Sequence, residues 1–330
     1  MPILDERHDF MHPVEGDTAW SESYYFNCYD PVTDSGFFTR CGIRPNEGTL
    51  DIGMSVWLPG GALAQGGGVR EQRTMIDSGL AVDGIEYTRI EPMRRWRITA
   101  DCETLVRNLH DAAEPVRPAR LRMEVGYEAL MPAIGADGQG AHGIGASVET
   151  RKSVGKGHLE QAGRWRGWIE VDGARHELGE ARGNRDKSWG PRTWSGTGSR
   201  MWRWFTINLG DDVHLGGIRI GTDAGDLHRG WIWKDGEHAS VREWHVESTI
   251  ADDGVTHTAT RLRVTDKQDR THEIDGVMLR NAPHRMEQGD RVAVLNEGLA
   301  RWSYGDRIGY GISEYLHQLD EDGRPRIAIA

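Results

Sequence analysis

The stretch Thr49-Leu50-Asp51-Ile52-Gly53-Met54-Ser55-Val56-Trp57-Leu58 places an apolar residue at every even position for ten residues. Successive side chains of a β-strand point to opposite faces, so this pattern would give the strand one continuous apolar face. The same period of two recurs at residues 95–100 and 202–209. The sequence therefore predicts antiparallel sheets in which one face of each strand is buried.

Turn signals separate these runs. Asp-Gly pairs occur at 83–84, 172–173, 235–236 and 253–254, and the chain has 43 glycines in 330 residues. Such pairs adopt the positive φ angles that tight hairpins require. Helical periodicity is scarce; the best window is 101–112, where a short helix is the expectation. The architecture is thus expected to be a succession of antiparallel hairpins.

The last 140 residues carry about eight strand-like runs, enough to close a barrel that holds one small ligand. We accordingly expect an all-β chain of two domains, 1–190 and 191–330, the first with longer loops. Periodicity cannot distinguish a closed sheet from two stacked ones, so a pair of β-sandwiches remains the alternative. The runs lie near 199–209, 212–221, 227–234, 236–250, 256–265, 271–280, 299–304 and 307–318.

Composition excludes several classes of function. The formal net charge is −11, and the basic residues form no stripe, so nucleic acid is not an expected partner. Three cysteines without CxxC spacing favour a reducing, cytoplasmic setting over a disulfide framework. We expect neither a signal peptide nor a membrane-spanning segment, because no basic start is followed by an apolar run and no long apolar stretch occurs. The HxxxH spacing of His8 and His12 lacks a third ligand. We expect no metal and no cofactor.

The segment Gly183-Asn184-Arg185-Asp186-Lys187-Ser188-Trp189-Gly190 differs from the strands around it. Together with Pro191, Arg192 and Trp194 it combines charged residues, aromatic residues, and the glycines and proline that interrupt regular secondary structure. Charge beside tryptophan indicates a partly buried polar site. A purely structural interpretation is also open, in which Arg185 or Arg192 pairs with Asp186 to hold a corner between the domains.

The same segment resembles the signature of the carotenoid 1,2-hydratase, hydroxyneurosporene synthase and AttH-like family, which commonly has His where this chain has Lys187. Three further stretches agree with that family: Glu22-Ser23-Tyr24-Tyr25-Phe26-Asn27, Gly42-Ile43-Arg44-Pro45-Asn46 and Gly311-Ile312-Ser313-Glu314-Tyr315. The resemblance implies two lipocalin-like (calycin) β-barrels in tandem. For the hydratase members it also implies cofactor-free addition of water to an isoprenoid double bond, and similar tandem folds include pericyclic cyclases.

Hydration of an alkene begins with proton transfer to carbon, which requires a carboxylic acid that stays protonated near neutral pH. Asp186 is the best candidate for this acid, and Glu22 or Glu314 is a candidate general base for the attacking water. Aromatic faces would stabilise the carbocation. We expect the substrate to contact Tyr24, Tyr25, Arg185, Trp189, Arg192, Trp194 and Trp204.

The leading hypothesis is therefore a hydratase, dehydratase or isomerase acting on a terpenoid, steroid or carotenoid-like molecule, as a monomer or homodimer. It predicts an apolar cavity with Asp186 at its wall. A non-catalytic carrier of hydrophobic ligands is the alternative from another class, because it needs the cavity but no buried acid. A cyclase and a structural protein with filled barrels are the remaining alternatives.

Overall fold

The computed structural model describes all residues except 112, 139–154, 193–198, 223–224, 289–290 and 328–330. The chain forms two compact units: 2–138 with 155–191, and Met1 with the region that begins at 192. The first is called the N-terminal unit and the second the C-terminal unit. The predicted boundary at 190–191 falls at the end of strand β12, Arg182–Pro191.

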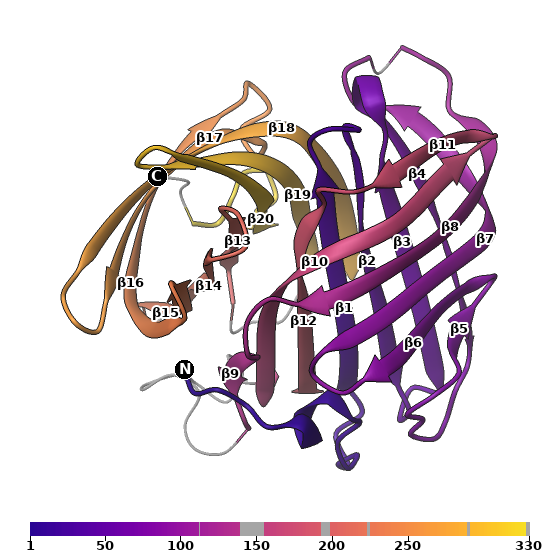
Figure 1. The fold of residues 1–330 in the computed structure, drawn as a ribbon, viewed down its shortest axis with the longest axis horizontal. Coiled ribbons are helices and arrows are strands. Elements are labelled where there is room, and N and C mark those ends of the chain that lie inside the picture. The colour runs from indigo at the N-terminus through magenta and orange to yellow at the C-terminus, as the bar shows by residue number, and fades with distance from the viewer. Residues whose placement is uncertain (112, 139–154, 193–198, 223–224, 289–290, 328–330) are drawn as a thin grey trace. The chain divides into compact units, whose positions relative to one another are not determined.

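Eight strands of the N-terminal unit close into a ring. Each strand pairs antiparallel with the next, and β8 pairs with both β7 and β10, which joins the two ends. Figure 1 shows β1, β2, β3 and β4 side by side in this unit. In ring order the strands are β10 (Gly157–Val171), β12, β1 (Trp20–Asp30), β2 (Ser35–Arg44), β3 (Thr49–Trp57), β4 (Ala62–Glu71), β7 (Arg95–Asn108) and β8 (Arg117–Ala129).

Short elements complete this unit. The hairpin β5–β6 extends the sheet beyond β7, and β9 and β11 each pair with β10. The N-terminal segment carries one turn of 3-10 helix before β1 begins. The bounds are η1 (Glu6–Asp9), η2 (Pro59–Gly61), β5 (Leu80–Val82), β6 (Ile85–Glu91), β9 (Ile134–Ala136) and β11 (Ala174–Leu178).

The alternation that predicts β3 is confirmed: Leu50, Ile52, Met54 and Val56 are at most 3% exposed and belong to one core. Aromatic rings fill the same core. The Phe26 ring lies 5.8 Å from that of Trp165 in an edge-to-face arrangement, a geometry that adds to the hydrophobic contribution of burial.

The C-terminal unit is a closed barrel in which β13 to β20 pair in chain order. The predicted eight runs are confirmed, although two strands are longer than predicted. Polar residues interrupt the apolar alternation between 281 and 298, and a bulge shifts the register near Met278. The strands are β13 (Met201–Asn208), β14 (Val213–Thr222), β15 (Gly225–Lys234), β16 (Glu237–Ile250), β17 (His257–Asp266), β18 (Thr271–Gln288), β19 (Arg291–Tyr304) and β20 (Arg307–Leu319).

Three of the four predicted Asp-Gly pairs form tight hairpin turns, whereas at Asp253-Gly254 only the glycine has a positive φ, 75°. At Asp83, Asp172 and Asp235 the φ angle lies between 47° and 53°, and the glycine after each has a φ of 82°. These pairs join β5 to β6, β10 to β11 and β15 to β16. The expectation of a short helix at 101–112 is wrong: 101–108 belong to β7, where Cys102, Thr104 and Val106 are buried at alternate positions.

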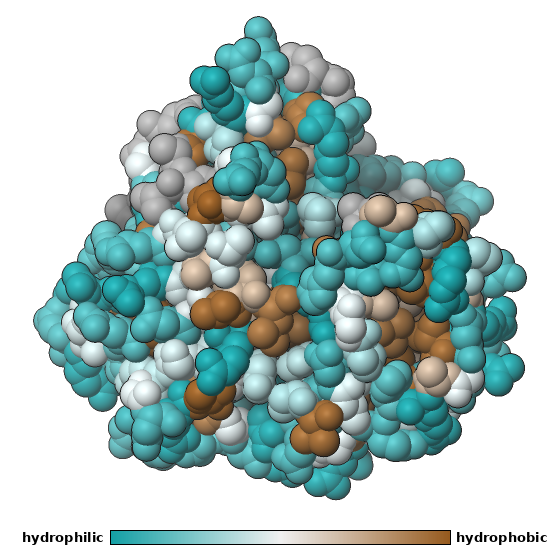
Figure 2. All heavy atoms as spheres, turned by 90° about the horizontal axis from the view of Figure 1, so that it is seen from above, coloured by the Kyte–Doolittle hydropathy of each residue, from teal (hydrophilic) through white to brown (hydrophobic). Residues whose placement is uncertain are grey.

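Exposed large hydrophobic side chains are scattered singly, as at Val32, Val69 and Val277. Figure 2 shows one face on which hydrophilic residues predominate and hydrophobic ones lie among them in small groups. Within the described parts of the chain, no helix has the length and apolar character needed to cross a membrane.

Candidate functional site

The motif on β12 divides its side chains between the two faces of the sheet. Lys187 is opposite Tyr24 of β1, and Arg185 is opposite Phe26, which belongs to the core of the unit. Directly opposed residues of an antiparallel pair share a face, so Arg185 and Lys187 point into the barrel. Asp186, between them in sequence, points to the outer face.

The inner face holds a network of buried charges. Arg185 forms an ion pair with Asp9 of the N-terminal segment, and its side chain is 1% exposed. Its Nε donates to Gln161 Oε1 at 2.7 Å, and the amide of Gln161 donates to the carbonyls of Met93 and Met131. The Met93 N–H in turn donates to Asp9 Oδ2 at 2.7 Å. Every charge and most hydrogen-bonding groups here have a partner.

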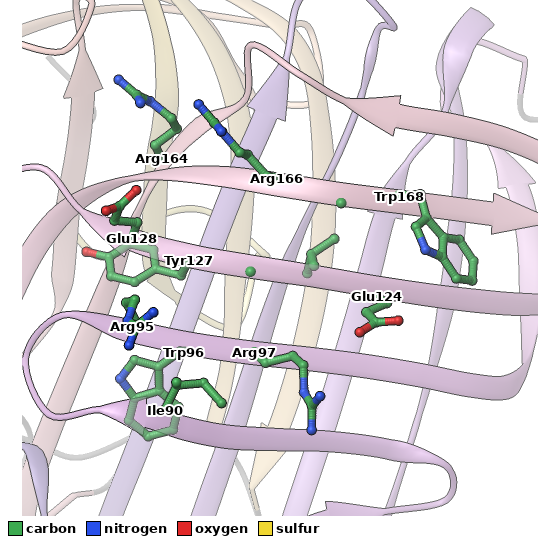
Figure 3. A pocket seen from close by; sticks show the side chains of 13 residues that line it. Ile90, Arg95, Trp96, Arg97, Glu124, Tyr127, Glu128, Arg164, Arg166 and Trp168 are labelled. Atoms are coloured by element: carbon green, nitrogen blue, oxygen red, sulfur yellow. The ribbon is translucent and has the colours of Figure 1, made fainter.

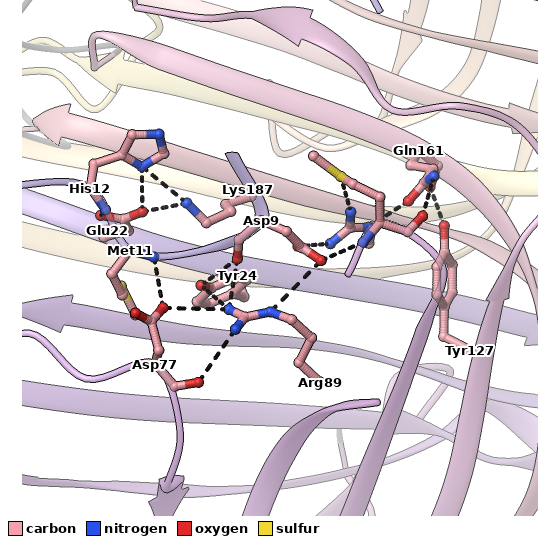
Figure 4. Close-up of polar contacts among 12 residues, drawn as sticks. Asp9, Met11, His12, Glu22, Tyr24, Asp77, Arg89, Tyr127, Gln161 and Lys187 are labelled. Carbon is pink, nitrogen blue, oxygen red and sulfur yellow. Dashed lines mark hydrogen bonds and ion pairs between the residues drawn. The ribbon is translucent and has the colours of Figure 1, made fainter. Parts of the chain in front are cut away.

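A second ion pair lies beside it. Lys187 Nζ contacts Glu22 Oε1, and both side chains are fully buried. His12 supplies two more contacts to Glu22: its backbone N–H donates to Oε2 at 2.9 Å, and its Nδ1 lies 2.8 Å from Oε1. Figure 4 shows His12, Glu22 and Lys187 converging from the N-terminal segment, β1 and β12. The network therefore fastens the N-terminal segment to the barrel interior.

The pKa values follow from burial and pairing. Burial alone would raise the pKa of Glu22, but the Lys187 ammonium and the His12 hydrogen bond lower it below its ordinary value. Burial would likewise raise the pKa of Asp9, and Arg185 lowers it. For Lys187, burial outweighs the attraction of Glu22 and lowers its pKa. The two carboxylates are thus held ionised.

Aromatic rings pack against this network. The Trp189 indole stacks on His12 with a centroid distance of 3.9 Å, and Lys187 Nζ lies 4.9 Å from its ring centroid. Tyr24 donates to the carbonyl of Asp9 and accepts from Arg89. Because these groups contact one another and are buried, the network is suited to position β12 rather than to meet a substrate.

The outer face carries a different cluster. Asp186 Oδ2 contacts Nε2 of His158 on β10, and Glu160 lies 3.7 Å from the same nitrogen. Asp186 pairs in register with Glu160 on one side and Tyr25 on the other, so the three occupy one row across β10, β12 and β1. The side chains of His158 and Asp186 are 25% and 15% exposed. The cluster therefore brings one imidazole and two carboxylates together, with His158 and Asp186 partly exposed and Glu160 buried.

Its donor set also has the geometry for a cation. One ligand atom each from His158, Glu160 and Asp186 lie within 4.8 Å of one another. An imidazole and two carboxylates suit a divalent transition metal. The expectation of a metal-free protein stays a prediction, which a metal titration would test.

The structure brings only some of the predicted site residues together. Tyr25 joins Asp186 on the outer face, whereas Glu22, Tyr24, Arg185 and Trp189 belong to the buried network on the inner face. The alternative in which Arg185 pairs with Asp186 is wrong, because Arg185 pairs with Asp9 on the opposite face.

The remaining predicted residues belong to the C-terminal unit. Glu314 accepts a 2.5 Å hydrogen bond from Trp202 Nε1 and faces Trp204 across the β13–β20 pair. The Arg192 guanidinium lies 5.8 Å from the Trp202 ring centroid. Trp194 is outside the described residues.

Sequence reasoning missed the partners of Asp186. His158 and Glu160 lie two apart on one strand and therefore share a face, which is a detectable signal. The sequence does not show that β10 pairs with β12, and this pairing places His158 and Glu160 beside Asp186. The HxxxH pair has no predicted role because it lacks a third ligand, yet His12 contacts Glu22 inside the barrel.

An open hollow of about 570 Å³ lies on the outside of β7, β8 and β10. Figure 3 shows arginines from β7 and β10 on opposite sides of it, with glutamates of β8 between them. Gly126 leaves its floor without a side chain. Asp186 does not line this hollow, so the predicted apolar cavity at Asp186 stays a prediction.

Solved structures share this architecture. An AttH-type protein of Nitrosomonas europaea has 14% identity and a TM-score of 0.66, with 98% of each chain covered. Kievitone hydratase from Nectria haematococca has 10% identity and a TM-score of 0.59, covering 96% of this chain and 93% of its own. CghA bound to Sch210972 has 10% identity and a TM-score of 0.55, covering 91% and 89%.

At these identities the similarity shows the fold alone. No curated protein matches the sequence. A family model does match, and it spans residues 5–319, which include both units and every described site residue. The chain therefore belongs to the family described as domain of unknown function DUF7064.

Proposed function

We propose that the protein is an acid–base enzyme that adds water to, or removes it from, an apolar unsaturated small molecule. The observation that carries the proposal is the contact between His158 and Asp186, whose side chains are 25% and 15% exposed on the outer face of the sheet. A carboxyl group bonded to an imidazole can hold a proton and deliver it. The motif's resemblance to the carotenoid hydratase and AttH-like family supports this chemistry, and the kievitone hydratase fold is compatible with it.

In the hydration direction, the Asp186–His158 pair gives its proton to one alkene carbon, and the π electrons form the new C–H bond. The Tyr25 ring, in the same row, stabilises the resulting cation. Water attacks the cation through an oxygen lone pair, and its surplus proton returns to the pair or to Glu160. Dehydration is the same sequence in reverse. The proposed substrates are terpenoid, steroid or carotenoid-like molecules.

The buried network acts indirectly in this scheme. Arg185 and Lys187 flank Asp186 in sequence and are each fixed by an ion pair on the opposite face. They would hold the backbone of β12 so that Asp186 meets His158. We therefore propose Arg185 and Lys187 as positioning residues.

The test is to incubate the protein with a panel of such substrates in H₂¹⁸O and analyse the products by mass spectrometry. Hydration incorporates ¹⁸O, and dehydration yields the alkene. Asp186→Asn should lower turnover about 100-fold or more, the usual contribution of a general acid, with the melting temperature retained. Glu177→Gln, an exposed carboxylate on β11, is the matched control.

Undiminished turnover in Asp186→Asn would overturn the assignment. Ligands that bind but leave unchanged from the whole panel would favour the carrier. Rearranged products without ¹⁸O would favour a cyclase or isomerase.

A further inference from the structure

The interior of the C-terminal barrel contains a buried arginine. Arg203 of β13 lies at alternate positions with Phe205 and Ile207, both in the barrel core. It is opposite Tyr315 of β20, another core residue, so its side chain points inward. Arg203 is 1% exposed. Its guanidinium retains its positive charge at all physiological pH values.

This charge has no matching carboxylate contact. Within the described parts of the chain, Nε and Nη1 of Arg203 have no hydrogen-bond partner and no acid lies in salt-bridge range. The Arg203 guanidinium lies 5.1 Å from the ring centroid of Tyr315. Arg219, opposite Arg203 on β14, is itself paired with Asp226 through a 2.6 Å hydrogen bond.

Two histidines share this part of the interior. His317 lies two residues after Tyr315 on β20, is 1% exposed, and has no partner for either ring nitrogen among the described residues. His257 stacks on Tyr315 at 3.8 Å, with Nε2 3.0 Å from the Ser313 carbonyl. Burial lowers the pKa of each to about 3, so both are neutral at pH 7. Of these three side chains, only Arg203 therefore carries a charge at pH 7, and the two imidazoles provide hydrogen-bonding groups.

An unpaired buried charge is unfavourable, since each unsatisfied group costs about 1–3 kcal/mol and a charge more. Functional sites are where such groups persist, because a ligand completes them. Asn296, fully buried across from Tyr315, likewise leaves Oδ1 without a partner in the described structure. That oxygen suits a hydroxyl beside the anionic group.

We propose that the interior of the β13–β20 barrel binds a small anion, carboxylate or phosphate, through Arg203, with His317 and Asn296 as further contacts. This site belongs to the C-terminal unit and is independent of the Asp186 cluster. It would hold either the anionic group of a substrate or a separate ligand.

Calorimetric titration of the full chain tests the proposal with two anions: inorganic phosphate and 3-hydroxybutyrate. The neutral analogue 1,3-butanediol is the uncharged probe. We expect saturable binding of at least one anion and none of the diol; which anion binds distinguishes the carboxylate and phosphate classes. Arg203→Met should weaken binding at least tenfold. Arg301→Met, an exposed arginine on β19, should leave it unchanged.

The melting temperature distinguishes an Arg203 that binds a ligand from an Arg203 that stabilises the fold. Without ligand, Arg203→Met should melt at the same or a higher temperature, because an unpaired buried charge is removed. Three outcomes would overturn the proposal: neither anion binds, Arg203→Met binds as tightly as the unmodified chain, or the variant is destabilised without ligand.

Discussion

The two barrels treat buried charge in opposite ways. On the inner face of its β12, the N-terminal unit matches buried charges in pairs, Asp9 with Arg185 and Glu22 with Lys187. In the described C-terminal barrel, Arg203 is equally buried but faces a tyrosine ring and neutral histidines. Both are rings of eight antiparallel strands. The fold therefore does not dictate how charge in the interior is matched, and the unmatched Arg203 is where we propose that a ligand binds.

The same contrast exists within one strand. On β12, Arg185 and Lys187 are locked by partners on the inner face, whereas Asp186 contacts the partly exposed His158 on the outer face. A motif that the sequence presents as one segment is thus divided between two faces by the alternation of the strand.

The largest effect is expected from breaking a matched pair. Lys187→Met leaves the buried Glu22 carboxylate without its ammonium partner and should lower the free energy of unfolding by about 3–5 kcal/mol. Glu22→Gln combined with Lys187→Met removes both charges and should recover most of that loss. Denaturant unfolding, followed through the three cysteines of the N-terminal unit, measures the change.

A decrease of less than about 1 kcal/mol in the free energy of unfolding of Lys187→Met would contradict this contrast between the two barrels. It would mean that Glu22 is satisfied by His12 alone.

The second effect is pH dependence. Burial lowers the pKa of His257 and His317 to about 3, so below about pH 6.5 the unfolded chain takes up protons that the folded chain does not. Protonation then favours unfolding, and the stability of the C-terminal unit should fall by about 1.4 kcal/mol per pH unit for each histidine. The titratable and charged groups that face these rings are Arg203, Tyr315 and the other histidine.

The acids of the N-terminal unit behave differently. The pKa values of Asp9 and Glu22 are lowered, so their contribution is complete above about pH 4.5 and is lost only as the pH falls through the lowered values. Melting temperatures from pH 7 to 5 measure the contrast. His317→Leu should reduce the slope by the share of one histidine, while His228, His238 and His272, whose pKa values burial also lowers, keep theirs; an unchanged slope would contradict the assignment.

The smallest effect concerns the thiols. Cys28, Cys41 and Cys102 are buried and free, and burial raises the pKa of Cys41 to about 12. Because the thiolate is the reactive form, the native chain should react with Ellman's reagent only through opening of the N-terminal unit. Lys187→Met should speed the reaction, and Arg301→Met should not. Rapid labelling of all three in the unmodified chain would show that this core is open.

Local patterns were enough for much of the fold. The alternation at 49–58 predicts β3, and Asp-Gly pairs predict three hairpins with positive φ. The window at 101–112 misled because Leu105 and Leu109 suggest a helix, while the period of two through Cys102 and Val106 is the one that the barrel buries.

By itself, the sequence determined the strands, their turns and one candidate acid, because these depend on neighbours along the chain. Only the tertiary structure decided which face of β12 each side chain occupies, since Arg185, Asp186 and Lys187 are all charged and offer no apolar alternation to set the register. It also supplied the partners: His158 is 28 residues from Asp186, and Asp9 is 176 from Arg185. Such contacts form only when distant strands pair, so no local pattern records them.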